Sequence, residues 1–204
     1  MAHHNTNLPF VELLDAVRGC RICESFLPAG PRPVLQIDPG ATILVAGQAP
    51  GRRVHASGLP FDDPSGDRLR DWMGISRDLF YDASRIAIIP MGFCYPGTGR
   101  SGDLPPRPEC APRWRKPLLD QLNRLALTLV IGQYAQRWHL PGVAGNLTET
   151  VRAFDEHAGI IALPHPSPRN NIWLKRNPWF EATVLPGLKR AVDKALTGSP
   201  PSGL

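Results

Sequence analysis

Four short apolar runs, each followed at once by a loop rich in glycine, proline or polar residues, constrain the fold of this chain most strongly. The runs cover residues 42–46, 85–89, 127–131 and 160–163. Runs of this length between chain breakers are typical of strands buried on both faces of a parallel sheet. Helical patterns lie before and between them, at residues 10–18, 66–73, 114–125 and 179–196. We therefore predict an α/β fold, a single-domain three-layer α/β/α sandwich around a central four-stranded parallel sheet.

The chain of 204 residues is long enough for one domain to bury a core without disulfide bonds. No internal repeat or linker divides it, so we expect one domain over residues 1–196 and a disordered tail over residues 197–204. No apolar run reaches the roughly 20 residues that span a bilayer, and the start MAHHNTNLPF lacks the pattern of a signal peptide. We therefore expect a cytoplasmic protein, without a membrane partner, that acts as a monomer.

The charge balance is basic, with 23 Lys+Arg against 18 Asp+Glu and a formal net charge of +5. Arginine supplies most of the positive charge, because lysine occurs only at positions 116, 175, 189 and 194. Arginine can bind a phosphate through two parallel hydrogen bonds, so its excess favours a polyanionic partner such as nucleic acid. A GC-rich genome would produce the same bias and is the alternative interpretation.

The loop after the first run, Gly-Gln-Ala-Pro-Gly at residues 47–51, is the first candidate site. Its terminal glycines let the backbone approach a ligand closely and turn N–H groups toward it. It is neither a P-loop, because no Gly-Lys-Ser/Thr follows, nor a dinucleotide fingerprint. A plain strand-to-helix turn is the alternative. In an open parallel sheet ligands bind beyond the carboxyl ends of the strands, which is where this loop would lie.

Two further loops carry side chains that could perform chemistry. The loop His-Pro-Ser-Pro-Arg-Asn at residues 165–170 follows the last run, and its prolines would hold His165 stiffly. In the segment 58–67, Asp62 and Asp63 could supply a general base or simply cap the following helix. Phe61 could be a platform on which a base stacks, or part of the core.

The four cysteines fall into two pairs, Cys20-x2-Cys23 and Cys94-x15-Cys110. In a reducing compartment this count argues against disulfide bonds. A CxxC pair can place two thiolates on one metal centre, and two more cysteines complete the site. The spacing does not separate zinc from an iron–sulfur cluster, and unrelated free thiols remain a further alternative.

Together these motifs resemble the uracil-DNA glycosylase superfamily, over a stretch from Cys20 to about Phe180. That superfamily has a Gly-x-x-Pro-Gly/Tyr loop after its first strand and a His-Pro-Ser/Ala loop after its last, as residues 47–51 and 165–170 do here. The four cysteines resemble those of its iron–sulfur branches, the thermostable uracil-specific one and its broad-specificity relative. The resemblance implies a [4Fe–4S] cluster rather than structural zinc. It also implies a monofunctional glycosylase of base excision repair, which flips uracil or another deaminated base out of DNA and leaves an abasic site.

The resemblance also assigns roles to single residues. Phe61 would stack on the extracted base, His165 would stabilise the departing base anion, and Asp63, with Asp62 as its rival, would activate water. The residues expected to contact the base are Gly47, Gln48, Ala49, Phe61 and Met91. Gln48 and Ala49 stand where related branches have Glu and Asp, and neither side chain can act as a base. Pro90 or Met91 stands where uracil-specific branches have Asn, which predicts a broader range of deaminated bases.

Basic and rigid segments would contact the DNA backbone. The residues expected there are Ser167, Pro168, Arg169, Asn170, Arg52, Arg53, His55, Lys175 and Arg176. The alternative interpretation is that these segments are solvated loops and that the tryptophans near Lys175 are buried against the sheet. Three other functions stay open: a damage- or abasic-site-binding protein with little turnover, a member that crosslinks to its product through His55 or His165, and a metal-binding protein unrelated to DNA.

Overall fold

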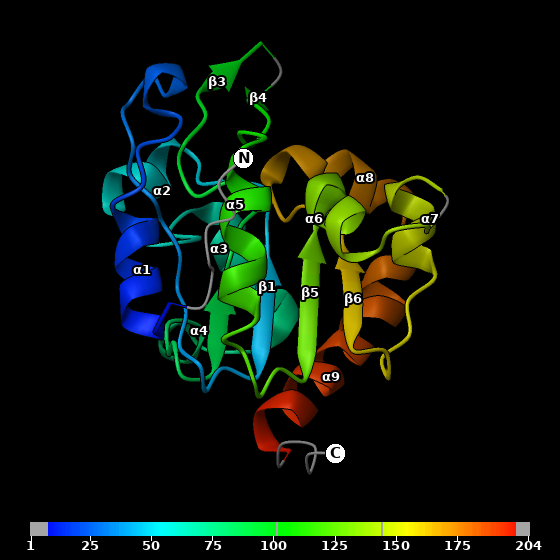
Figure 1. Ribbon diagram of the computed structural model, residues 1–204. Coiled ribbons are helices and arrows are strands. Elements are labelled where there is room, and N and C mark those ends of the chain that lie inside the picture. The colour runs from blue at the N-terminus through cyan, green and yellow to red at the C-terminus, as the bar shows by residue number, and fades with distance from the viewer. Residues whose placement is uncertain (1–7, 101, 144, 199–204) are drawn as a thin grey trace.

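The four apolar runs form one parallel sheet with the strand order β2-β1-β5-β6 (Figure 1). Its strands are β1 (Ile43–Ala46), β2 (Ile86–Ile88), β5 (Leu127–Ile131) and β6 (Ile160–Leu163). Ile43 of β1 pairs with Ile86 on one side and with Leu127 on the other, and Thr128 pairs with Ile160. The computed structural model describes residues 8–100, 102–143 and 145–198. Each strand lies inside its predicted run, so the sheet prediction is confirmed.

Helices cover both faces of the sheet. The helices on one face include α1 (Phe10–Arg18) and α5 (Cys110–Leu119), and those on the other include α3 (Pro64–Met73) and α9 (Leu185–Thr197). Successive side chains of β1 point to opposite faces, as strand geometry requires. Ile43 and Val45 pack in a core that contains Leu69 of α3, whereas Leu44 packs in a second core with Leu13 of α1. Two cores separated by a sheet are the predicted three-layer sandwich.

The connecting segments are mostly short helices. They are α2 (Arg52–Ser57), α4 (Arg77–Phe80), α6 (Gly132–His139), α7 (Leu147–Arg152) and α8 (Asn171–Arg176). One-turn 3₁₀ helices at Glu24–Phe26 and Pro168–Asn170, and a π-helical turn at Phe180–Val184 that leads into α9, complete the helical segments. A small hairpin of β3 (Thr98–Gly99) and β4 (Gly102–Asp103) stands apart from the main sheet.

The structure corrects the predicted helix boundaries in two places. The helix predicted at 114–125 is α5, which begins earlier, at Cys110, and ends at Leu119. The helix predicted at 66–73 is α3, which begins at Pro64 because Asp63 caps it, accepting a hydrogen bond from the Gly66 N–H at 2.9 Å. At the C-terminus α9 continues through Thr197, and residues 199–204 of the predicted tail lie outside the described part of the chain.

The strand arrowheads in Figure 1 all point to the edge of the sheet where α2, α8 and the β3–β4 hairpin lie. The loops that follow the strands therefore gather at this edge, together with the hairpin. None of the helices in the described ranges has both the length and the apolar character needed to cross a membrane.

Candidate active site

A cavity of about 440 Å³ lies where these loops meet. Its wall is built by the loop after β1, the loop into α3, Pro90 after β2, the β3–β4 hairpin and the loop after β6. The predicted site residues that line it are Gly47, Gln48, Ala49, Phe61, Asp63, His165, Ser167, Arg169 and Asn170. Those outside its lining are Asp62, Met91, Pro168, Arg52, Arg53, His55, Lys175 and Arg176. Several loops thus form one site at the carboxyl edge of the sheet.

Phe61 sits in this wall in an unusual backbone conformation. Its φ of 56° is the one positive value among the non-glycine residues that the structure describes. The ring lies against the loop after β1, so that a Cβ on Gly47 would be 3.3 Å from the Phe61 Cζ. The Phe61 carbonyl lies over the first turn of α3, where a Cβ on Gly66 would be only 1.7 Å from its oxygen. Two glycines therefore make room for the ring and for its backbone.

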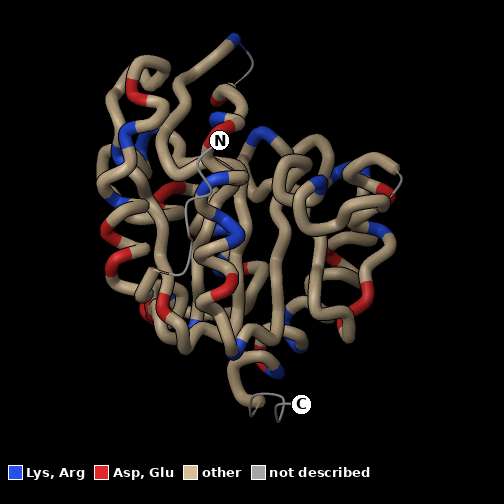
Figure 2. Tube along the Cα trace, viewed as in Figure 1, with Lys and Arg blue, Asp and Glu red and all other residues tan. Residues whose placement is uncertain are grey.

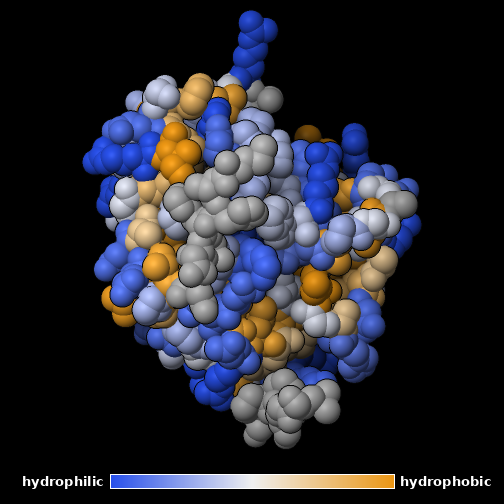
Figure 3. Space-filling model, viewed as in Figure 1, coloured by the Kyte–Doolittle hydropathy of each residue, from blue (hydrophilic) through white to orange (hydrophobic). Residues whose placement is uncertain are grey.

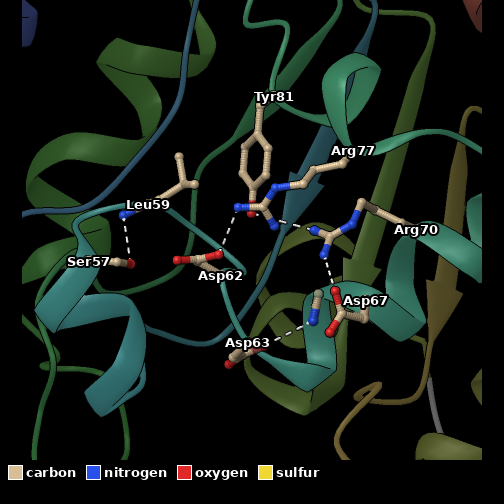
Figure 4. Close-up of polar contacts among 9 residues, drawn as sticks. Ser57, Leu59, Asp62, Asp63, Asp67, Arg70, Arg77 and Tyr81 are labelled. Carbon is tan, nitrogen blue, oxygen red and sulfur yellow. Dashed lines mark hydrogen bonds and ion pairs between the residues drawn. The ribbon is translucent and has the colours of Figure 1, made fainter.

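The two neighbouring carboxylates, Asp62 and Asp63, have different surroundings (Figure 4). Asp62 accepts a hydrogen bond from Arg77 Nη2 at 2.9 Å outside the cavity, and this bond lowers the pKa of the Asp62 carboxyl. Asp63 lines the cavity, and its Oδ1 accepts the bond from the Gly66 N–H. One oxygen of Asp63 thus holds the helix start, while its carboxylate borders the cavity. Of the two rivals, only Asp63 lines the cavity.

His165 enters the cavity from the end of β6 and is held in one orientation. Its Nδ1 accepts a hydrogen bond from the Ser167 N–H at 3.2 Å, and its carbonyl accepts one from Asn170 Nδ2 at 2.7 Å. Burial lowers the pKa of His165, and the carboxylates of Asp63 and Asp103 oppose that shift. The imidazole is therefore neutral near pH 7. With Nδ1 accepting, Nε2 carries the proton and can donate a hydrogen bond to a ligand.

The family comparison decides what kind of site this is. A family model described as the uracil DNA glycosylase superfamily matches residues 35–189, which is more than half of the chain. The chain belongs to the uracil DNA glycosylase superfamily. The matched range contains all four strands of the sheet and both glycine- and histidine-bearing loops. Membership supports a glycosylase, a hydrolase whose substrate is DNA.

A hydrogen bond joins the loop after β1 to the segment after β4. Gln48 donates from Nε2 to the Leu104 carbonyl at 3.1 Å, so its amide is held by the segment after β4. Met91 was expected to contact the base, but its side chain packs in the core and is 6% exposed. Pro90 lines the cavity instead, because consecutive residues of an extended segment point in opposite directions.

Of the predicted DNA-contacting cations, Arg169 lines the cavity, and the others lie outside its wall on α2 and α8. Arg52 and Arg53 are exposed on α2, and Lys175 and Arg176 are exposed on α8. Figure 2 shows basic residues at several points along this edge, from the hairpin to α8. Arg100 lies between β3 and β4 and is exposed. In Figure 3 the atoms that project farthest from the molecule are hydrophilic. A phosphate backbone could follow such a rim.

His55, which is predicted to contact DNA, and the two tryptophans near Lys175 have their rings close to other aromatic rings. The ring of His55 packs near Tyr95, with their centroids 6.0 Å apart, and His55 does not line the cavity. The tryptophans next to Lys175 are partly buried: Trp173 donates to Thr148 Oγ1 at 2.8 Å and packs edge-on against Phe180. The alternative interpretation, that these aromatic residues pack inside, therefore holds for the tryptophans.

All four cysteines line a second, smaller cavity behind the loop that follows β2. The thiols are free, and burial raises the pKa of Cys94 to about 11 and that of Cys110 to about 12. Two N–H groups already point at sulfur: Trp114 Nε1 is 3.3 Å from Cys20 Sγ, and the Phe93 N–H donates to Cys110 Sγ. In the described ranges no three His, Cys, Asp or Glu residues are placed to hold a metal ion.

The sequence reasoning missed one charged residue of the cavity wall. Asp103, at the end of β4, lines the same wall as Asp63 and His165. The strands of its hairpin have two residues each, too short for an apolar alternation to reveal them. The only local signal is the glycine-rich composition of residues 97–102, which indicates a turn but does not place Asp103 in a site.

Proposed function

We propose that this protein is a monofunctional DNA glycosylase of base excision repair that removes uracil, and other deaminated bases, from DNA. The observation that carries the proposal is the meeting of an aromatic ring, a carboxylate and a neutral histidine around one cavity: Phe61, Asp63 and His165. An extracted base needs a stacking surface, its sugar needs a negative charge, and the departing base needs a hydrogen-bond donor. We further propose that the protein acts as a cytoplasmic monomer.

Binding begins with the phosphates. The arginines around the cavity mouth neutralise the DNA backbone, and Arg169, which lines the mouth, reaches the nucleotide next to the damaged one. The rigid loop of residues 165–170, with Ser167, Pro168 and Asn170, enters the base stack. Flipping the nucleotide costs a few kcal/mol and is easiest for a mispaired base, so a U·G pair is favoured over an intact one. Phe61 then stacks on the extracted base.

The chemistry follows the charges that form when the N-glycosidic bond breaks. The bonding electron pair leaves with the base, and the sugar becomes an oxocarbenium-like cation. His165 donates its Nε2–H to the base and stabilises the developing anion. Asp63 uses the oxygen that does not cap α3 to orient a water, whose oxygen bonds to C1′ and whose proton passes to the carboxylate.

Two further features support the details of this proposal. None of the four lysines, all of which lie in the described ranges, lines the cavity, which supports a glycosylase that does not cut the strand through a lysine amine. Pro90, not an amide side chain, follows β2 in the wall, and the Gln48 amide is bound to Leu104. With these positions unable to read the pyrimidine edge, the pocket accepts hypoxanthine or xanthine as well as uracil.

We propose that Cys20, Cys23, Cys94 and Cys110 hold a [4Fe–4S] cluster, with structural zinc as the alternative. Four thiols around one cavity and N–H donors to two sulfurs fit the donor set of such a cluster. The same four thiols would also suit a structural zinc ion, which four sulfurs bind at about 2.3 Å. A cluster spreads its ligands over several irons. When bound, it would crosslink the segments that carry the cysteines.

The test of the function uses a labelled oligonucleotide with one central uracil, incubated with excess protein and treated with hot alkali. Strand cleavage in the alkali-treated lane alone establishes a monofunctional glycosylase, and the same gel with hypoxanthine and xanthine defines its range. Asp63→Asn should slow excision by about 10²-fold or more, whereas the neighbouring Asp62→Asn, outside the cavity, should stay within a few-fold of the wild type. Full-length DNA in both lanes for every substrate would refute the proposal.

One rival function is favoured by a specific observation. Gln48 and Ala49 occupy the loop after β1 with side chains that cannot act as a base, as a damage-binding protein with little turnover would tolerate. A native gel separates the two: retarded DNA without excision supports the rival. The cofactor proposal has its own readout, namely iron and acid-labile sulfide per chain, which Cys94→Ser should reduce.

A further inference from the structure

The β3–β4 hairpin brings a second carboxylate to the cavity. Asp63 and Asp103 are the carboxylates found in its wall within the described residues, and they come from two different elements, one from the start of α3 and one from the end of β4. Both act on the same imidazole, because each raises the pKa of His165 against its burial. The cavity is therefore bordered by two negative charges and one neutral histidine.

Contacts within the hairpin hold Asp103 in place. Thr98 pairs with Asp103 across the two strands, and its Oγ1 donates to Asp103 Oδ1 at 3.4 Å while the same hydroxyl bonds to Tyr95. The Leu104 N–H donates to the Gly97 carbonyl at 2.8 Å, and the Leu104 carbonyl accepts from Gln48. The hairpin is thus closed by contacts of Gly97 and Thr98, and Leu104, the residue after Asp103, joins it to the loop after β1.

The other oxygen of Asp103 is turned toward the site. Its Oδ2 would lie 3.3 Å from a Cβ on Gly51, the residue that ends the loop after β1. The preceding residue, Gly102, lies so close to the loop after β6 that a Cβ there would be 2.3 Å from Arg169 Nη1. Asp103 therefore stands between the two loops that form the cavity, where the sugar of a flipped nucleotide would enter.

If the protein only bound DNA, a carboxylate at position 103 would lower its affinity. Arg169, whose Nη1 approaches Gly102, would contact phosphate, and the Asp103 carboxylate on the next residue repels that phosphate. The same charge is favourable only when positive charge develops on the substrate, as it does on the deoxyribose when the N-glycosidic bond breaks. An exposed carboxylate in this setting weakens the ground-state complex and stabilises the transition state.

We propose that Asp103 is a second catalytic carboxylate, which faces the deoxyribose and stabilises its positive charge while Asp63 orients the water. In this step the C1′–N bond breaks with its electron pair on the base, and water supplies the oxygen that bonds to C1′. The proton of that water passes to Asp63 and then to solvent, and Asp103 stays ionised throughout. The inference rests on the proposed glycosylase function.

The experiment measures DNA binding and single-turnover excision separately, for the wild type and for Asp103→Asn, on the same uracil duplex. Because the variant loses the charge and keeps the shape, we expect excision to slow by about 10- to 100-fold and DNA affinity to stay the same or increase. If the substitution only disturbed the structure of the hairpin, it would lower both the excision rate and the DNA affinity. The matched control is Asp120→Asn, which removes a carboxylate just after α5 that pairs with Lys116 and lies outside the cavity lining. It should change neither DNA affinity nor the excision rate.

The outcomes of this experiment are distinguishable. An active wild type with an Asp103→Asn variant that excises at the wild-type rate overturns the role of Asp103 and leaves the proposed function standing. A variant that loses affinity and excision together, with the same far-UV circular dichroism, also overturns it. A wild type that excises neither uracil, hypoxanthine nor xanthine overturns the proposed function, and the role of Asp103 with it. Thr98→Val gives a second check, with a smaller loss of rate than Asp103→Asn expected because it removes one contact of the carboxylate.

Discussion

Replacing Gly66 by alanine tests whether the first turn of α3 positions the stacking ring. The added Cβ would lie 1.7 Å from the Phe61 oxygen and 2.7 Å from the Phe61 carbonyl carbon. Non-bonded atoms need about 3 Å or more, so the Phe61 backbone would have to move by at least about 1.3 Å. Gly66 has an ordinary φ, and the steric contact alone is therefore responsible.

Two effects of Gly66→Ala follow, with different magnitudes. Overpacking of this kind costs about 1 to 3 kcal/mol in the free energy of unfolding. A displacement of about 1 Å in a group that positions the substrate can cost about 10²-fold in rate. We therefore expect excision of uracil to fall by about two orders of magnitude while the protein stays folded, as measured by single-turnover gels and by urea unfolding.

The matched control is Gly159→Ala, immediately before β6. The nearest atom to a Cβ there is the Ala126 carbonyl oxygen at 4.0 Å, and the backbone has no positive φ. This variant should unfold within about 0.5 kcal/mol of the wild type and excise at the same rate. If Gly66→Ala behaved like Gly159→Ala in both measurements, the position of Phe61 would not depend on the space at residue 66, and the reasoning would be wrong.

Three further predictions concern charged groups. Burial lowers the pKa of His139 to about 4, so between its ordinary value of about 6.5 and about 4 the unfolded state binds a proton that the native state excludes. Stability should therefore fall as the pH drops through this window, and urea unfolding at about pH 7.5 and about pH 5 should show a smaller fall for His139→Gln. Arg115, fully buried, donates to the Ile89 and Pro90 carbonyls, so Arg115→Met should cost about 2 to 4 kcal/mol in urea unfolding; an unchanged midpoint would contradict this. Arg169→Gln should weaken DNA binding and reduce the slope of log affinity against log salt by about one, and an unchanged slope would exclude a phosphate contact.

The sheet and its edge could be predicted because their determinants are local. Each strand is a buried apolar run ended by a breaker, and β1 and β5 lie within the runs read from the sequence. Parallel strands bring their carboxyl ends to one edge, so the loops at 47–51 and 165–170 had to meet. The helix boundaries were less predictable: α5 contains Pro117 and begins at Cys110, where no capping side chain marks the start.

The details of the site depend on partners distant in the sequence. Asp62 and Asp63 are adjacent and chemically identical. They differ in environment because Arg77 binds Asp62 outside the cavity. The choice between Pro90 and Met91 follows from which side of the extended segment faces the core. Asp103 enters the site because its hairpin is held by contacts to the loop after β1, and no pattern within the hairpin indicates that contact.

The segment from Pro90 to Cys94 borders both cavities, with Pro90 in the wall of the first and Cys94 in the wall of the second. The Gly92 N–H donates to the Gln48 carbonyl at 2.9 Å, which joins this segment to the loop after β1. Damage to the thiols during purification would therefore reach the base pocket through a few bonds while leaving the central sheet folded. The excision assays that test the function therefore require protein whose thiols are intact, and a test of folding alone does not report on their state.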